Sequence, residues 1–368
     1  MHMKTKNLSK PACLVVFFAV AICLFGCAKK EEKIDIAMIM TEKSRLHDGT
    51  FNQSTYEGIE KYAKSNNLKY KAYPPESKAV EDYLKAIEEA YSAGSEILVA
   101  PGFDFSVSIF IAQDLYPDIH FIVIDAIPHN GKFDETYEEK IAPNTYVVLF
   151  AEEQAGFLAG YAIVKDGFRT LGFFGGREFP AVVKYGYGFV QGAEFAAKEL
   201  GLGQGEVTIK YDYAGNFDST PENQSKAASW YNDGVEVIFA CGGALGYSVM
   251  KAAESMPGKW VIGVDMDQGG DSETVITSAL KMLANAVGLA IESHYGGTFP
   301  GGQSRSLGAD ENGIGMVMDN AKFKNFTQAD YDKIYQMLVK NQDGITSAII
   351  NDVSVKATDL PCQYVVLK

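Results

Sequence analysis

Two successive series of short apolar runs, with a helical pattern after almost every run, most constrain how this chain can fold. The first series has strand patterns at 34–40, 68–72, 96–100, 119–124 and 145–150, and helical patterns at 50–65, 80–93 and 106–115. Runs rich in β-branched residues between helices are typical of parallel strands that helices cover on both faces. Residues 34–150 therefore predict one doubly wound α/β lobe.

The second series begins after about residue 150. Its strand patterns lie at 171–174, 207–211, 235–240, 259–264 and 275–280, and its helical patterns at 152–164, 181–200, 221–231, 247–255 and 282–295. Its strands end like those of the first series, because Ala100-Pro101-Gly102 corresponds to Ala240-Cys241-Gly242-Gly243, and Asp125 corresponds to Asp265. We therefore predict a second lobe over 151–281 and a cleft lined by strand carboxyl ends, where open α/β sheets bind ligands. About 282–310 is expected to return to the first lobe, and about 311–368 to the second.

The N-terminal segment has the pattern of an export signal followed by a short polar tether. Three lysines precede the apolar run 14–25, which is too short to span a bilayer as a mature helix. The run ends in Leu24-Phe25-Gly26-Cys27, which resembles a bacterial lipobox. We therefore predict a signal peptide at 1–26, a tether at 27–33, and a lipid on Cys27 that anchors the protein at the extracytoplasmic face of the cell membrane. The alternative is an ordinary secretory signal with an incidental cysteine.

The charge of the chain argues against two classes of partner. Its 47 Asp and Glu against 33 Lys and Arg give a formal net charge of −14, and removal of the predicted signal peptide removes only cations. An acidic body of this kind disfavours nucleic acid and anionic lipid surfaces, so the lipid alone would provide the membrane contact. Of the five cysteines, only Cys241 and Cys362 lie beyond the signal and the lipidation site, which excludes a disulfide scaffold.

The segment after the first strand pattern has residue types that suit a ligand better than a plain connection. It reads Asp48-Gly49-Thr50-Phe51-Asn52-Gln53. Phe51 offers a large apolar face, and the Asn52 amide can donate and accept hydrogen bonds along one edge. A flat ring rich in heteroatoms would fit both side chains. The alternative is that Phe51 packs on the helix behind it and that Asn52 caps that helix.

Two aspartates end apolar strands at matching places in the two series. A carboxylate accepts paired hydrogen bonds of the kind that vicinal sugar hydroxyls donate. Asp125 and Asp265, from opposite lobes, could therefore hold a ribose or a hexose. Each alone could be a helix cap or a turn residue, but their matching positions favour ligand binding.

Further candidates lie at other strand ends of the second series. Gly242-Gly243 would let backbone N–H groups approach a ligand closely. Lys281 could reach a hydroxyl or ring oxygen, although a lysine in this position could equally be solvated. Phe239 or Tyr247 could supply a second ring opposite the first. Phe239 lies inside a strand pattern, so it could equally belong to the core.

Signals for enzymatic chemistry are weak. Glu152-Glu153 could act as paired acids in glycoside chemistry, but adjacent helical residues point about 100° apart, and the helix dipole favours Glu at a helix N-terminus. The histidines of the body show no metal-ligand spacing, and no Gly-x-Ser-x-Gly elbow occurs. We therefore predict a binding protein with no enzymatic activity, no metal and no cofactor.

Several motifs along the chain occur in an order that is typical of one protein family. Besides the lipobox and Asp48-Gly49-Thr50-Phe51-Asn52-Gln53, they are Glu153-Gln154-Ala155-Gly156-Phe157-Leu158-Ala159-Gly160, Gly172-Phe173-Phe174-Gly175-Gly176, Tyr187-Gly188-Phe189, Gly263-Val264-Asp265-Met266-Asp267-Gln268 and Thr277-Ser278-Ala279-Leu280-Lys281. Together they resemble the basic membrane protein family of lipoproteins, which are similar to purine nucleoside receptors of spirochaetes and other bacteria.

The resemblance implies a type I periplasmic-binding-protein fold, with two Rossmann-like lobes joined by a hinge, that delivers nucleosides to an ABC importer. It implies that Phe51 stacks on the base, that Asn52 bonds the base edge, and that Lys281 reaches the ribose. The implied ligand-binding set is Asp48, Phe51, Asn52, Asp125, Phe239, Gly243, Asp265 and Lys281, in which the two strand-end aspartates hold ribose hydroxyls and the glycine offers a backbone contact. The implied partners are a nucleoside, an ABC permease and the membrane through the lipid, and the protein is expected to be a monomer.

Other functions remain compatible with the same clamshell. A sugar or autoinducer receptor would use the cleft in a similar way, and a signalling lipoprotein would present its ligand to a membrane sensor instead of a transporter. A nucleoside hydrolase is disfavoured because the sequence shows no cluster of metal-binding carboxylates. Purine and pyrimidine ligands are not distinguished by the sequence.

Overall fold

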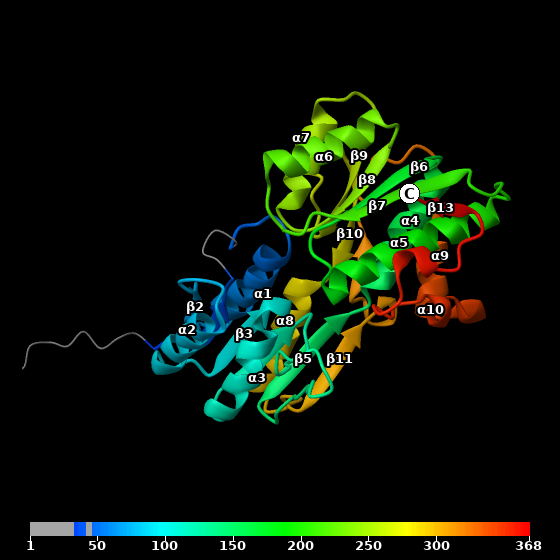
Figure 1. The fold of residues 1–368 in the computed structure, drawn as a ribbon. Helices are drawn as coiled ribbons and strands as arrows, with labels where there is room; N and C mark the ends of the chain where they lie inside the picture. The colour runs from blue at the N-terminus through cyan, green and yellow to red at the C-terminus, as the bar shows by residue number, and fades with distance from the viewer. Residues whose placement is uncertain (1–32, 42–45) are drawn as a thin grey trace, which may run out of the picture. The chain divides into compact units, whose positions relative to one another are not determined.

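Two mainly parallel sheets form the framework of the computed structural model, which describes residues 33–41 and 46–368 (Figure 1). Residues 34–368 belong to one structural unit. The predicted signal peptide at 1–26, the lipidation site Cys27 and the tether up to residue 32 lie outside the described residues and stay predictions. Across the described ranges, no helix is both long enough and apolar enough to cross a bilayer.

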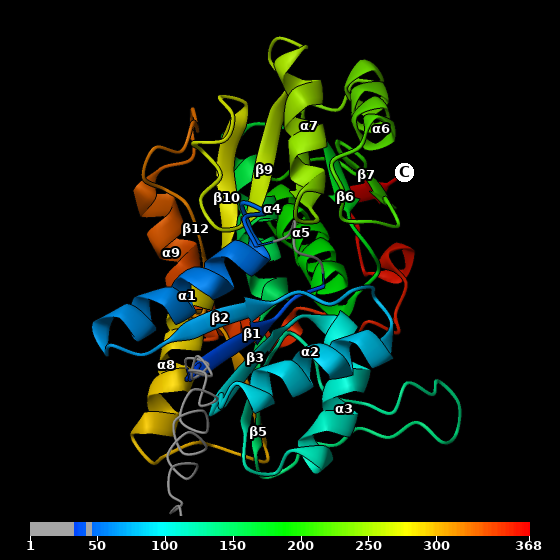
Figure 2. The ribbon, with the colours of Figure 1, turned by 90° about the vertical axis from the view of Figure 1, so that its left-hand side faces the viewer.

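The first sheet has the strand order β11-β5-β4-β3-β1-β2, and its paired strands are parallel. The strands are β1 (Ile36–Ile39), β2 (Tyr70–Tyr73), β3 (Ile97–Pro101), β4 (His120–Ile124), β5 (Thr145–Phe150) and β11 (Gln303–Leu307). The helices α1 (Phe51–Ser65) and α8 (Leu283–Tyr295) cover one face, and α2 (Val80–Ser92) and α3 (Ser106–Leu115) cover the other (Figure 2). Successive residues of β1 alternate between these two apolar layers, which explains the uninterrupted apolar run in the sequence.

The second sheet has the order β12-β10-β9-β8-β6-β7-β13. Its strands are β6 (Thr170–Gly175), β7 (Val207–Tyr213), β8 (Val237–Cys241), β9 (Trp260–Asp265), β10 (Val275–Lys281), β12 (Ile314–Met316) and β13 (Val365–Leu367). The pairing of β12 with β10 is antiparallel, and the other pairs are parallel. The helices α4 (Glu152–Asp166) and α5 (Pro180–Glu199) pack on one face, and α6 (Pro221–Asn232) and α7 (Leu245–Glu254) pack on the other.

The helices α4 and α5 pack with their backbones in direct contact. A Cβ atom added to any of four glycines would lie well under 3.0 Å from a carbonyl oxygen of the opposite helix: Gly156, Gly160, Gly188 and Gly192. Real Cβ atoms do not approach a neighbouring backbone this closely, so these positions require glycine. The two helices therefore form one rigid layer beneath the second sheet.

The chain passes from one sheet to the other after β5, after β10 and after β11. The strand β11 lies at an edge of the first sheet, whereas β12 and β13 form the two edges of the second. The C-terminal part also contains α9 (Gln328–Val339), α10 (Ile345–Ala348) and the 3-10 segments η3 (Ala309–Glu311), η4 (Gln342–Gly344) and η5 (Ala357–Asp359). The lobe boundaries, 34–150 with about 282–310 and 151–281 with about 311–368, stay a prediction, which this strand membership supports. The two doubly wound sheets themselves confirm the predicted fold class.

Candidate functional site

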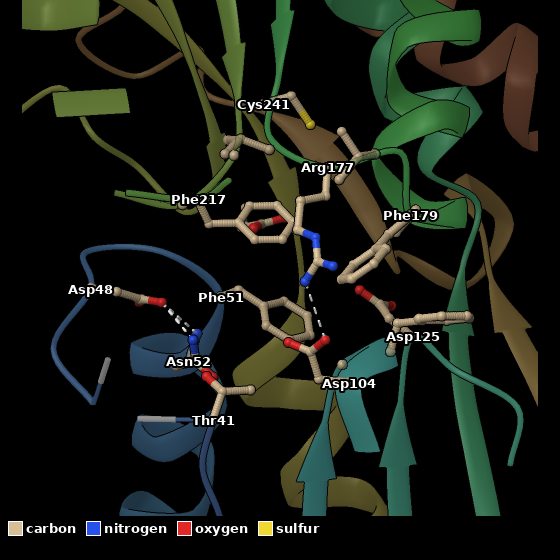
Figure 3. Close-up of a pocket in the computed structure, with 18 of the residues that line it drawn as sticks. Thr41, Asp48, Phe51, Asn52, Asp104, Asp125, Arg177, Phe179, Phe217 and Cys241 are labelled. Atoms are coloured by element: carbon tan, nitrogen blue, oxygen red, sulfur yellow. Dashed lines mark hydrogen bonds and ion pairs between the residues drawn. The ribbon is translucent and has the colours of Figure 1, made fainter. Parts of the chain in front are cut away.

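A pocket of about 240 Å³ lies at the carboxyl ends of the strands of both sheets (Figure 3). Its first wall comes from the segments that follow β1, β2, β3 and β4, and its second wall from the ends of β8, β9 and β10 and the segments after β6 and β7. Seven predicted ligand-binding residues line it: Asp48, Phe51, Asn52, Asp125, Gly243, Asp265 and Lys281. The pocket lies where the sequence predicts a cleft, and the ligand-binding roles stay predictions.

The floor of the pocket is a buried lysine surrounded by carboxylates. The side chain of Lys281, the last residue of β10, is only 2% exposed. Its Nζ lies 2.5 Å from Asp125 Oδ2, 3.1 Å from Glu152 Oε1 and 4.0 Å from Asp265 Oδ1. Three aromatic rings also surround this ammonium group, with centroids 5.3–5.4 Å from Nζ: Phe51, Phe150 and Tyr185. A buried cation is stable only with such partners, so the cluster fixes the position of Lys281.

Burial and neighbouring charges shift the pKa values of this cluster. Burial raises the pKa of Asp125 to about 7, although the Lys281 ammonium acts in the opposite direction. Burial likewise raises the pKa of Asp265, against the effects of Lys281 and of the Tyr185 hydroxyl. Burial by itself would lower the pKa of Lys281, but the Asp125 and Glu152 carboxylates outweigh it, and the pKa of Lys281 is raised. Lys281 is therefore charged at neutral pH, whereas Asp125 can gain or lose a proton near neutrality.

Asp125 and Asp265 have the same unusual backbone conformation at the ends of β4 and β9. Their φ angles are +60° and +67°, a left-handed region that non-glycine residues rarely adopt and that Asp tolerates better than most. Both side chains are thereby brought to Lys281. Asp125 Oδ1 is buried, and among the described residues no group donates a hydrogen bond to it. Because buried polar atoms are normally paired, this oxygen is a natural acceptor for a ligand donor.

The segment from Asp48 to Gln53 is ordered by the Asp48 carboxylate. This group accepts hydrogen bonds from the backbone N–H groups of Thr50, Asn52 and Gln53 at 3.0–3.3 Å. It also accepts one from Asn52 Nδ2 at 2.7 Å (Figure 3). Asp48 therefore caps α1, and the alternative in which Asn52 is the cap is wrong. The Asn52 amide is instead held in a fixed orientation at the pocket wall.

The predicted role of Phe239 as a second stacking ring is contradicted by its position. Phe239 is fully buried and is not part of the pocket lining. Its ring packs against those of Phe173, Tyr185 and Phe189, with centroids 5.5–5.8 Å away. The reason is that Phe239 lies inside β8, two residues before its end, and both faces of that strand are covered by helices. It therefore belongs to the core, the alternative that the sequence also allowed.

Other rings line the second-lobe side of the pocket. They belong to Phe179 and Phe217, whose centroids lie 5.6 Å apart (Figure 3). Tyr247 is not part of the lining, and its hydroxyl instead lies where a Cβ of Gly49 would be. Phe179 and Phe217 follow β6 and β7, so the rule that points to strand ends would also have found them.

Glu152 has a role that its place at the start of α4 does not reveal. Its side chain is 3% exposed and forms ion pairs with Lys281 at 3.1 Å and with Lys184 at 3.7 Å. The neighbouring Glu153 accepts a hydrogen bond from Asn351 instead, at 3.0 Å. The two acids therefore face different partners, which does not suit a pair of glycosidase acids. Glu152 is a buried counter-ion, in addition to being an acid in the first turn of a helix.

The charges around the pocket favour an uncharged, hydroxyl-rich ligand. The charged residues of the lining are Asp48, Asp104, Asp125, Asp218 and Asp265, and Lys78, Arg177 and Lys281. An additional anion would meet an excess of carboxylates, whereas neutral hydroxyl and amide groups can bond to both signs of charge. Over the part of the chain that the structure describes, no group of His, Cys, Asp and Glu side chains is arranged to hold a metal ion.

Two bacterial proteins illustrate the relatives of this chain. The ABC transporter nucleoside-binding protein BmpA of Lactococcus lactis subsp. cremoris is 27% identical over 307 residues, which cover 77% of this chain and 82% of that protein. Basic membrane protein A of Borreliella burgdorferi is 29% identical over 347 residues, which cover 92% and 93%.

Solved structures show the same fold. A solute-binding protein of an ABC transporter system from Aeropyrum pernix K1 matches with a TM-score of 0.66 and 20% sequence identity, over 87% of this chain and 88% of that one. The predicted type I periplasmic-binding-protein fold is thereby confirmed. The sequence profile of the Bmp family, described as PnrA-like ABC transporter substrate-binding proteins, matches residues 35–358. The chain that builds this pocket therefore belongs to the Bmp family of PnrA-like ABC transporter substrate-binding proteins.

Proposed function

We propose that this protein is a nucleoside receptor of an ABC importer and that purine nucleosides are its ligands. We further propose that it acts as a monomer without enzymatic activity, held at the extracytoplasmic face of the membrane by a lipid on Cys27. The family supports a substrate-binding role with a permease as partner. The printed name of the Lactococcus relative supports a nucleoside as the ligand.

The observation that carries this proposal is the unsatisfied Asp125 Oδ1 beside the Lys281 ammonium. Two neighbouring ribose hydroxyls can donate to Asp125 and to Asp265, which approach the same lysine from opposite sheets. The Lys281 ammonium has three N–H donors, and among the described residues two carboxylates, Asp125 and Glu152, lie within hydrogen-bond distance of it. One donor therefore remains for a hydroxyl or for the ring oxygen of the sugar.

The aromatic and amide groups near this cluster suit a nucleobase. Phe51 borders the lysine, and its ring offers an apolar face to a planar heterocycle. Phe179 and Phe217 provide rings on the other side of the pocket. Because Asp48 accepts from Asn52 Nδ2, the Asn52 carbonyl oxygen remains for a donor on the base edge. A base joined to a sugar could use these aromatic and amide groups together with the carboxylate–lysine cluster.

Binding between two walls implies a mechanism for closure. Each sheet supplies part of the contacts, so a ligand binds the closed arrangement of the lobes more tightly than an open one and shifts the equilibrium toward closure. A permease could then distinguish loaded from unloaded receptor by the surface that the closed lobes present.

A thermal-shift screen against nucleosides, free bases and sugars tests the proposal. A ligand far above its dissociation constant stabilises the protein by about 3–4 kcal/mol, which raises Tm by several degrees. We expect this rise with guanosine, inosine or adenosine, and none with the corresponding free bases. The absence of a response to every nucleoside, with normal cooperative unfolding, would refute the nucleoside proposal.

A sugar receptor is the second candidate, and the carboxylate–lysine cluster favours it equally. The cluster forms hydrogen bonds with hydroxyl groups, so it would also bind a hexose. A rise in Tm with sugars alone would assign the cluster to a hexose and Phe51 to one face of its ring. Turnover of inosine to base and ribose would instead show that the protein is a hydrolase.

A further inference from the structure

An ion pair bridges the two walls at the mouth of the pocket. Asp104 belongs to the 3-10 segment η2 (Phe103–Phe105), which follows β3 of the first sheet, and Arg177 follows β6 of the second. Arg177 Nη1 lies 3.6 Å from Asp104 Oδ1 (Figure 3). Both residues line the pocket, so the pair can form only when the two strand ends are close together.

Aromatic contacts accompany this ion pair. The guanidinium carbon of Arg177 lies 4.7 Å from the centroid of the Phe179 ring. The Phe179 ring in turn lies 5.0 Å from that of Phe103, the residue next to Asp104. Arg177 therefore touches a charge on the first wall and a ring on its own wall, and that ring also reaches across to the first wall.

We propose that Asp104 and Arg177 form a latch that holds the closed lobes together, and that Arg177 acts as a positioning residue for Phe179. The inference rests on the proposed function, since the latch at the mouth of the same pocket would control how long a nucleoside stays bound. With the latch closed, Phe179 is clamped between Arg177 and Phe103 and forms a fixed wall. With the latch open, the ring loses its contact with Phe103 on the opposite wall, Arg177 is no longer anchored to Asp104, and the path to solvent opens.

The exposure of the pair fits a contact that is made and broken repeatedly. The side chains of Arg177 and Asp104 are 45% and 29% exposed. Charges that remain partly hydrated lose little solvation when they pair, and an exposed pair of this kind stabilises a structure only weakly. The Lys281–Asp125 pair at the floor is 2% and 6% exposed, and breaking it would leave uncompensated buried charges. The mouth is therefore the place where opening can begin.

The kinetics of guanosine binding test the latch. A contact made only in the closed form slows dissociation and leaves the association rate almost unchanged. For Arg177→Gln, which removes the ion pair and the cation–ring contact together, we expect stopped-flow fluorescence to show dissociation about five- to tenfold faster. For Asp104→Asn, which removes the ion pair alone, we expect a smaller increase in the same direction. The association rate should change by about twofold or less.

Charge reversal separates a latch from a merely structural effect. The double variant with Asp104→Arg and Arg177→Asp restores the attraction in the opposite direction, so its dissociation rate should return most of the way toward wild type. The matched control is Lys140→Gln, which removes a surface ion pair of 2.6 Å with Asp114 on the first lobe alone. This control should leave both rates unchanged. Equal dissociation rates in wild type and both single variants would overturn the proposal.

A measurement without ligand keeps the latch testable if guanosine does not bind. Small-angle X-ray scattering of ligand-free protein should give a larger radius of gyration for Arg177→Gln than for wild type and Lys140→Gln. Failure of wild type to bind any nucleoside would refute the proposed function, and the scattering comparison would then decide the latch alone. An identical radius of gyration for all three proteins would in that case overturn it.

Discussion

Asp125 and Asp265 occupy the same place in the two lobes but have different surroundings. Both end an apolar strand with a left-handed φ angle, and both approach Lys281. Asp125 is 2.5 Å from the ammonium, and its Oδ1 receives no hydrogen bond from any of the residues that the structure describes. Asp265 is 4.0 Å from the same ammonium and accepts a hydrogen bond from Tyr185 at 3.2 Å.

This difference shows that two lobes of the same architecture can place a residue at the same position and still give it different interactions. The fold delivers a carboxylate to the cleft from each sheet. The neighbouring side chains then decide that Asp125 holds the lysine and faces a ligand, whereas Asp265 is partly occupied by the protein itself. Ligand binding should therefore depend more strongly on Asp125 than on Asp265.

Replacing Asp125 by alanine should have the largest effect on binding. The change removes the unsatisfied acceptor and the counter-ion of a buried lysine, so we expect guanosine affinity to fall about a hundredfold or more. The preference for the nucleoside over free guanine should disappear at the same time. Isothermal titration calorimetry with both ligands measures this, with Asp114→Ala on the surface of α3 as the control. If the variant still preferred the nucleoside over free guanine as strongly as wild type does, the assignment of Asp125 to the ribose would be wrong.

Replacing Phe51 by alanine should have the next largest effect, and it compares the two aromatic walls. Stacking of a base on an aromatic ring is worth about 1–3 kcal/mol, so affinity should fall about ten- to a hundredfold. Calorimetry on Phe51→Ala and Phe179→Ala shows which wall supplies more of the stacking. Phe133→Ala, at a ring that is 78% exposed, is the control. Unchanged affinity in Phe51→Ala would contradict its stacking role.

Replacing Asp265 by asparagine should weaken binding by only about tenfold, because the amide keeps one acceptor and the loss corresponds to a single charge-assisted hydrogen bond. The Tyr185→Phe variant sharpens the comparison, since it removes the donor that occupies Asp265 in the protein. Affinities of both variants for guanosine, set beside those of Asp125→Asn, give the ranking. If Asp265→Asn were more damaging than Asp125→Asn, the assignment of the two roles would be reversed.

The dependence of stability on pH compares Asp125 with its neutral amide in the absence of ligand. The pKa of Asp125 is raised by burial from 3.8 to about 7, so between these values the native state holds a proton that the unfolded state has lost. Its contribution to stability is therefore complete below about pH 4 and is lost as the pH rises to about 7. The Tm of ligand-free wild type should fall more steeply over this range than that of Asp125→Asn. Parallel curves from differential scanning calorimetry would argue against the raised pKa.

The strands and the strand-end aspartates could be predicted because simple local patterns produce them. The helix predicted at 106–115 and the strand predicted at 145–150 have those bounds in the structure. The strand β11 could not be found in this way, because it is a polar edge strand whose residues are mostly exposed. Without an apolar run or an alternation, the sequence gives no periodic signal for it.

The site was harder to predict wherever two distant segments determine it together. Glu152 looks like an ordinary acid in a first helical turn until β10 places Lys281 beside it. Phe239 has the residue type of a stacking ring, but its register inside β8 directs it into the core. Phe179 and Phe217 follow strand ends, so their place near the cleft could be predicted, but which way their rings point depends on packing with neighbours.

The glycine contacts between α4 and α5 affect what shared sequence motifs can tell about the ligands of this family. Two of the motifs on which the resemblance rests, Glu153–Gly160 and Tyr187-Gly188-Phe189, contain three of the four glycines that let these helices touch. The close approach of the two backbones requires glycine at these positions, whatever molecule binds in the cleft. Related proteins can therefore share these motifs and still bind different ligands. The ligand has to be determined from the residues that line the pocket.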